Sequence, residues 1–110
     1  MPTEFKHSLI NDIGTVPVDV VSIDPGIRAT VIGCNLANVT GGDTVVVNVD
    51  VVGADSQAVR YANSVIIPAN SSLKLITHGE KLVLTPNSSL RITSNLANSI
   101  DATVSYVEIT

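Results

Sequence analysis

The chain has 110 residues, the length of one domain. Hydrophobic residues make up 45% and charged residues only 15%, against about 25% in a typical globular domain, so part of the surface is expected to be neutral or covered by a partner. The net charge is −4, and the six basic residues are scattered from Lys6 to Arg91, which excludes the basic patch that nucleic-acid binding requires.

The single cysteine, Cys34, excludes an internal disulfide. The polar segment Met1–Ile10 lacks the apolar core of a signal peptide. Apolar runs such as Val45–Val47 are too short to span a bilayer. We therefore expect a soluble protein with no membrane partner, made in the cytoplasm of its host cell.

The residue pattern is β-like along the whole chain. No segment keeps a helical spacing of apolar residues, and prolines and glycines interrupt the chain at short intervals. The short runs between them are spaced as in a sandwich or barrel and predict eight or nine strands. These runs are Thr3–Ile10, Thr15–Ile23, Arg28–Leu36, Thr44–Val52, Gln57–Ile67, Ser72–Ile76, Lys81–Leu84, Ser88–Thr93 and Ala102–Ile109.

The first two runs carry features of sheet edges. Thr3–Ile10 is polar and is expected to be an N-terminal arm or an edge strand. Pro17 has no amide hydrogen, so the second run lies at an edge or opens to solvent there. Asp24-Pro25-Gly26 then forms a tight turn, because proline presets one central position and glycine accepts a positive φ at the next.

The next two runs predict which side chains are buried, because alternate residues of a strand share a face. In the third run, one face is expected to hold Ile32, Cys34 and Leu36, and the other Ala29, Val31 and Gly33. In the fourth, the inward face is expected to hold Val45, Val47, Val49 and Val51. Cys34 is then a buried structural thiol.

Two short sequences occur twice. Asn35-Leu36-Ala37-Asn38 returns as Asn95-Leu96-Ala97-Asn98, and Asn70-Ser71-Ser72-Leu73 returns as Asn87-Ser88-Ser89-Leu90. The first pair is interpreted either as equivalent connectors at one end of two related halves, or as chance and common turn chemistry. The second pair gives weaker support for the same interpretation.

The residues that usually carry catalysis are sparse. His7 lies in the polar first run and His78 in a predicted hairpin turn, Thr77–Glu80, and neither has a partner at zinc-ligand spacing. The carboxylates form no calcium-loop pattern, and Gly41-Gly42 is not followed by the lysine or helix start of a phosphate loop. The sequence therefore predicts no enzyme, no metal and no cofactor.

Several segments resemble small β-sandwich virion proteins of tailed bacteriophages. They are Leu9–Thr15, Asp24–Asn38, Ile67–Leu73, Gly79–Leu84 and Ser105–Ile109. In that family a Pro-Ala-Gly-Ser-Leu turn precedes a Lys-Leu-Val-Leu strand, and the chain ends in a valine-rich strand with Glu-Ile. Asn70 stands here where glycine is expected.

The resemblance implies a structural part of a phage particle. The leading hypothesis is a capsid decoration (cement) protein, which binds and stabilises the assembled shell. A neck, tail or baseplate component is the first alternative. A carbohydrate- or receptor-binding module is the second, although only Phe5, Tyr61 and Tyr106 are aromatic.

The expected fold is an all-β, antiparallel, jelly-roll-like sandwich, with residues 1–12 as arm or edge strand and 13–110 as a single domain. We expect a homo-oligomer, specifically a trimer, located in the virion and bound to other virion proteins, above all the major capsid protein. The candidate interaction surface comprises Phe5, Lys6, His7, Asn35, Asn38, Asn95 and Asn98.

Overall fold

Nine strands form the regular structure of residues 3–77 and 80–110, the part of the chain that the computed structural model describes. They are β1 (Thr3–Ile13), β2 (Val18–Ser22), β3 (Arg28–Asn38), β4 (Val45–Val52), β5 (Ala58–Ile67), β6 (Ser72–Ile76), β7 (Leu82–Leu84), β8 (Ser89–Ser94) and β9 (Ile100–Ile109). These described residues contain no helix, and hence none that crosses a membrane.

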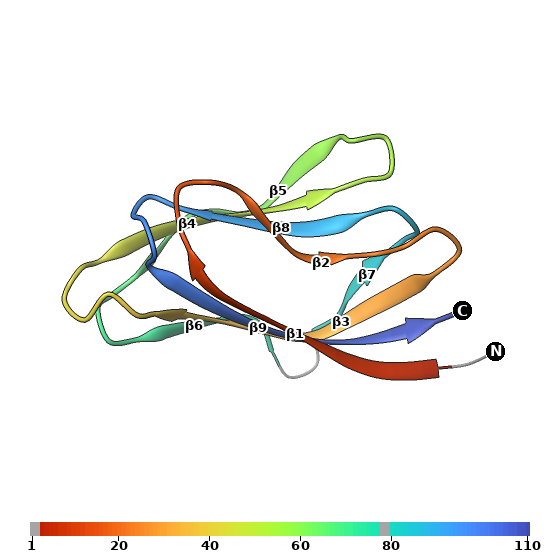
Figure 1. Ribbon diagram of the computed structural model, residues 1–110, viewed down its shortest axis with the longest axis horizontal. Helices are drawn as coiled ribbons and strands as arrows, with labels where there is room; N and C mark the ends of the chain where they lie inside the picture. Colours follow the sequence, from red (N-terminus) through yellow and green to blue (C-terminus); the bar gives the residue numbers. More distant parts are fainter. Residues whose placement is uncertain (1–2, 78–79) are drawn as a thin grey trace.

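The strands form two antiparallel sheets that face each other (Figure 1). Sheet A has the order β1-β9-β3, with β6 and β7 both paired to the far side of β3. Sheet B has the order β2-β8-β4-β5. The second predicted run therefore does lie at a sheet edge, as β2, and begins directly after Pro17.

The strand order confirms the jelly-roll prediction. The chain crosses between the sheets after β1, β2, β3, β5, β7 and β8, and stays in one sheet only from β4 to β5 and from β6 to β7. When β6 and β7 count as one interrupted strand, each sheet has four strands, as in the double Greek key of jelly rolls.

The core lies between the sheets and is almost entirely aliphatic. In the part of the chain that the structure describes, nineteen hydrophobic residues form one buried cluster, with valine the most frequent member. Val45, Val47 and Val49 of β4 are fully buried, as predicted, whereas Val51 is half-buried and packs at the margin of the cluster. β-Branched side chains suit this position because they lose little rotamer freedom on a pleated surface.

A β-bulge in β3 overturns the predicted sorting of its faces. The register with β9 shifts between Val31 and Gly33, so Ile32 turns outward and is 39% exposed. Ala29 and Val31 point inward before the bulge, and Cys34 points inward after it, together with Leu36. The prediction that Ile32 shares a face with Cys34 is therefore wrong, because the extra residue of a bulge reverses the alternation.

The two copies of the Asn-Ser-Ser-Leu sequence form two matching turns. Asn70 and Asn87 both adopt the left-handed conformation, with φ of 60° and 65°. In each turn the next serine closes back through its hydroxyl, Ser71 to the carbonyl of Pro68 and Ser88 to the carbonyl of Thr85. Each turn carries the chain from one sheet to the other. The repeated sequence with the weaker support from the sequence, Asn-Ser-Ser-Leu, is thus the one whose two copies have similar structures.

Candidate interaction surfaces

Three of the six basic side chains form ion pairs. Arg91 binds Asp19, Arg60 binds Asp50, and Lys6 binds Glu108. Within residues 3–77 and 80–110, no three His, Cys, Asp or Glu side chains come together as metal ligands would. His7 is exposed on β1, whereas His78 and the centre of its predicted hairpin turn lie outside the described residues. The candidate functional sites that remain are surfaces that could contact another protein.

Cys34 is buried, as the sequence predicted, with 3% of its surface exposed. Burial in the aliphatic core disfavours the thiolate and raises the pKa of Cys34 to about 12. The thiol therefore stays protonated at neutral pH. It acts as a small apolar side chain of β3 rather than as a nucleophile.

Asn38, at the end of β3, joins the two sheets. Its Nδ2 donates hydrogen bonds to the carbonyls of Asp43 at 2.8 Å and Ile67 at 2.9 Å, and its Oδ1 accepts from the backbone N–H and the hydroxyl of Thr40. The residue is buried, 6% exposed. Its polar atoms are thus occupied within the chain.

The Asn-Leu-Ala-Asn copies lie at the same end of the sandwich, but they are not equivalent. The first copy is the last part of β3, whereas the second is the turn between β8 and β9. Asn95 of that turn bonds both backbone groups of Val46, and Asn98 is exposed with φ of 52°. The interpretation as matching connectors of two related halves is therefore wrong.

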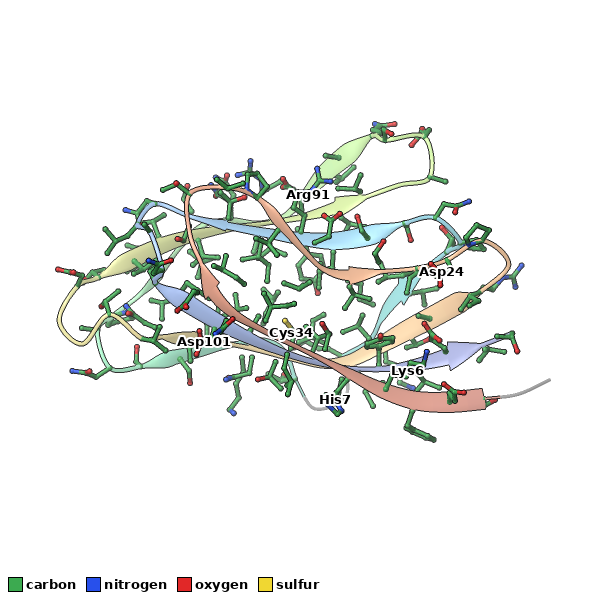
Figure 2. The ribbon with its side chains drawn as sticks, in the orientation of Figure 1. Lys6, His7, Asp24, Cys34, Arg91 and Asp101 are labelled. Atoms are coloured by element: carbon green, nitrogen blue, oxygen red, sulfur yellow. The ribbon has the colours of Figure 1, made fainter. Side chains whose placement is uncertain are left out.

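The N-terminal candidates lie on β1, where Figure 2 shows His7 near the middle of the sheet and Lys6 nearer the N-terminus. Thr3–Ile13 is an edge strand of sheet A. Phe5 points outward, 79% exposed, and neighbours Val107 of β9. Lys6 faces the other way and binds Glu108 at 2.9 Å, an ion pair that raises the pKa of Lys6. The structure thus separates the β1 candidates from Asn38, Asn95 and Asn98 at one end of the sandwich. Asn35, opposite Thr103 of β9, lies between the two groups.

The outer face of sheet A carries an apolar row that the sequence analysis missed. Phe5, Val107, Thr30 and Val83 are successive neighbours across β1, β9, β3 and β7. Val83 is 64% exposed. The signal was available in the alternation of the strands, but the row becomes visible only once the order of strands in the sheet is known.

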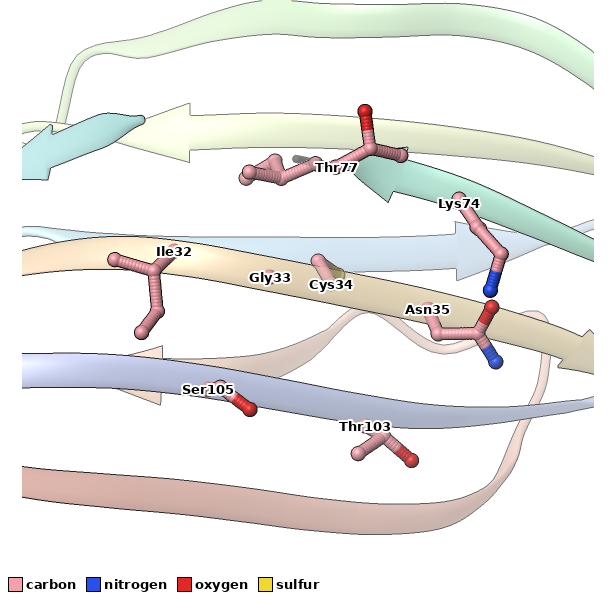
Figure 3. A pocket seen from close by; sticks show the side chains of 9 residues that line it. Ile32, Gly33, Cys34, Asn35, Lys74, Thr77, Thr103 and Ser105 are labelled. Atoms are coloured by element: carbon pink, nitrogen blue, oxygen red, sulfur yellow. The ribbon is translucent and has the colours of Figure 1, made fainter. Parts of the chain in front are cut away.

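Beside this row lies an open hollow of about 370 Å³, also on sheet A (Figure 3). It forms where β3 passes from its pairing with β7, which ends at Val31, to its pairing with β6, which begins at Cys34, and where Gly33 has no side chain. Asn35, Lys74 and Thr103 line it. The buried Oδ1 of Asn35 has no hydrogen-bond partner within the described chain. The hollow is wide and open, a shape that suits contact with another protein surface better than enclosure of a small molecule.

Comparison with known proteins supports the fold. No family model matches the sequence, and no curated protein matches it. Solved structures do match over nearly the whole chain. One is a subunit of disulfide-linked pili on Bacillus endospores, with 12% identity, a TM-score of 0.56, and coverage of 98% of this chain and 88% of the other.

Two phage capsid structures also contain similar chains. In the acid-stable capsid of Helicobacter pylori bacteriophage KHP30 the identity is 12% and the TM-score 0.52, over 98% of this chain and 87% of the other. In the cyanophage Pam1 capsid they are 21% and 0.51, over 96% and 83%. At these identities the likeness establishes a shared all-β fold.

Proposed function

We propose that this protein is a structural component of a tailed-phage virion, and specifically a capsid decoration protein that binds the assembled shell and the major capsid protein beneath it. The observation that carries the proposal is that this chain matches chains of two phage capsids in length as well as in fold. The KHP30 and Pam1 capsid chains are only slightly longer than this one, since 87% and 83% of their lengths are covered. A small jelly roll thus occurs as a separate chain in phage capsids.

The surfaces of the molecule support an assembly role. Among residues 3–77 and 80–110, the paired charges, the buried thiol and the open hollow offer no enclosed site for a substrate, whereas the outer face of sheet A exposes apolar side chains such as Phe5 and Val83. Exposed apolar area of this kind marks protein–protein contacts. A decoration protein needs such contacts with the shell and with its own copies, as the expected homo-oligomer, proposed as a trimer, would have.

Cys34 weighs against a pilus subunit of the disulfide-linked kind. Such a link needs a thiol that reaches a second chain and ionises readily. Cys34 is the single cysteine, it is buried, and its pKa is raised to about 12. The folded chain therefore offers no thiol for that type of assembly.

The test is capsid binding. Capsids of the encoding phage, assembled without this protein, are mixed with the purified protein, and occupancy and heat resistance are measured. We expect saturable binding and a raised disruption temperature. Val83→Lys and Val59→Lys form a matched pair, because these valines are 64% and 58% exposed on opposite sheets. Weaker binding by the first alone places sheet A against the shell, and absence of binding to expanded capsids refutes the proposal.

The alternatives predict different results. A neck, tail or baseplate component occupies one vertex or the tail in electron micrographs of whole particles, instead of the entire shell. A carbohydrate-binding module binds specifically in a glycan screen. Sugar sites usually present aromatic platforms, but here Phe5 and Tyr61 lie on different sheets and Tyr106 is half-buried.

A further inference from the structure

The free edge of β1 is unusually regular. Thr3–Ile10 pairs with β9 residue for residue, and the register shifts only beyond Ile10, where Asp12 adopts φ of 57°. On the other side of the strand, the backbone groups of Thr3–Ile10 form no further hydrogen bond with the described residues. A long, regular strand with unpaired N–H and C=O groups is a template for pairing with another strand.

The other sheet edges carry features that obstruct such pairing. β2 is five residues long and has a bulge between Asp19 and Val21. β6 and β7 are five and three residues long. β5 is longer, but its ladder with β4 shifts register twice and Ser64 has φ of 51°. Short strands and bulges are the usual protection of a sheet edge against strand addition. The stretch Thr3–Ile10 of β1 is eight residues long and contains no bulge.

An inward-pointing lysine is another protective feature, and Lys6 occupies that position. Its ammonium, however, is already held by Glu108 of the same chain at 2.9 Å, and Glu4 lies at 3.5 Å. Because the charge has carboxylate partners within the chain, strand addition along this edge does not leave it unpaired. Lys6 therefore obstructs pairing much less than an isolated lysine would.

We infer that the β1 edge pairs with β1 of a second copy of this chain, antiparallel about a two-fold axis at His7. An axis perpendicular to the sheet keeps outward side chains opposite outward side chains. Phe5 then faces Leu9 of the second copy, and this contact occurs twice. Both side chains point outward and are exposed, by 79% and 65% in the single chain.

The neighbouring registers are less favourable. An axis at Lys6 sets two lysines directly opposite each other, which destabilises a strand pair. An axis at Phe5 or Ser8 pairs only five residues of the regular stretch Thr3–Ile10 and an axis at Leu9 only three, against seven for an axis at His7. The His7 register combines nearly full overlap with two apolar cross-strand contacts. The sequence of β1 is therefore complementary to itself in one register.

The resulting dimer joins two copies of sheet A into one continuous sheet. Its outer face then gathers Phe5 and Leu9 from both chains beside the apolar row across β9, β3 and β7. A contact confined to one strand pair belongs to the small interfaces that bury less than about 1,200 Å², so we expect a weak dimer that forms with rising concentration. A two-fold contact cannot close a trimer, so the trimer expected from the sequence would have to use another surface.

The test compares two double variants in sedimentation equilibrium. In Phe5→Lys with Leu9→Glu, each lysine faces a glutamate of the second copy, so the dimer is expected to persist. In Phe5→Lys with Leu9→Lys, two pairs of lysines face each other, and the dissociation constant is expected to rise by about tenfold or more. Both positions are exposed, so the two variants should melt alike, which thermal unfolding checks. Equal association of the two variants, or a wild type that stays monomeric at every concentration, overturns the inference.

Cysteine cross-linking tests the register. In the His7→Cys variant the two new thiols lie directly opposite each other, within the Cα separation of about 4.4–6.8 Å that a disulfide spans. Asn11→Cys is the matched control, because its two copies would be about eight residues apart along the strands, near 26 Å. We expect rapid oxidation to a covalent dimer for the first variant alone. Equal rates for both variants overturn the register. Because these measurements need no capsid, they succeed or fail independently of the proposed function.

Discussion

Substitution of Asn38 tests whether this residue is structural rather than part of a binding surface. Asn38→Ala removes the donor for the Ile67 and Asp43 carbonyls and the acceptor for Thr40. Thr40 is half-exposed and can bind water instead, but Ile67 is 1% exposed, so water does not replace the hydrogen bond that its carbonyl accepts from Nδ2. Four hydrogen bonds are lost, and at roughly 1 kcal/mol each, less what water restores at Thr40, they give about 3 kcal/mol.

Urea or thermal unfolding measures this loss. For a domain of this size, about 3 kcal/mol corresponds to a fall in Tm of roughly 12 °C. Asn38→Asp is expected to cost at least as much, because it turns a carboxylate oxygen toward the carbonyls that Nδ2 now serves. Its size is unchanged, so a large cost cannot be attributed to a cavity.

Asn98 supplies the matched control. It ends the second copy of the same four-residue sequence, but it is exposed and no hydrogen bond of its side chain is found among the described residues. Asn98→Gly keeps the left-handed backbone accessible and is expected to change stability by less than about 0.5 kcal/mol. If Asn38→Ala proves as mild as Asn98→Gly, the structural role assigned to Asn38 is refuted.

Three further predictions concern the backbone and the core. Gly14→Ala should cost about 1–3 kcal/mol in chemical unfolding, because its Cβ would meet the backbone of Ala97 at 3.0 Å, whereas Gly42→Ala should be neutral because that site is open. Asn87→Val should lower stability by about 1–2 kcal/mol and Asn87→Gly should not, since φ is 65°; equal Tm values would contradict this reasoning. Cys34 should resist iodoacetamide at pH 8 until the protein is unfolded. The pKa of Cys34 is raised in the folded state, so the contribution of the protonated thiol to the stability of the fold is fully present below the ordinary pKa of 9.0. The free energy of unfolding should then fall, relative to Cys34→Ala, by about 1.4 kcal/mol per pH unit as pH rises from 9.0 toward 12.

Local chemistry explains which features were predictable from the sequence. The alternating valines of β4 specify a strand with one buried face, and that face is buried as predicted for Val45, Val47 and Val49. The turns at Asn70 and Asn87 match because asparagine tolerates the left-handed conformation and the following serine closes the turn. Both effects act within a few residues, so they do not depend on the rest of the fold.

The features that could not be predicted depend on distant strands. The bulge at Ile32 exists only in the ladder between β3 and β9, whose residues are about seventy positions apart, and the sequence of β3 alone gives no sign of it. The Asn-Leu-Ala-Asn copies differ for the same reason. The first copy continues its pairing with β9, which holds it extended, whereas the second follows the end of β8 and turns. Identical residues therefore adopt different structures.

These outcomes change where a partner is best sought. The repeated asparagines are among the residues predicted to bind a partner, yet Asn38 is occupied by the Asp43 and Ile67 carbonyls and Asn95 by the backbone of Val46. A group already bonded within the chain gains little by contacting another protein, because the internal bond must first be given up. The β1 edge has the opposite character, because Phe5 is exposed and the outer backbone groups of Thr3–Ile10 form no hydrogen bond with the rest of the described chain. Pairing there costs the chain no internal hydrogen bond. The edge and outer face of sheet A are thus where binding to a copy or to a shell would gain most.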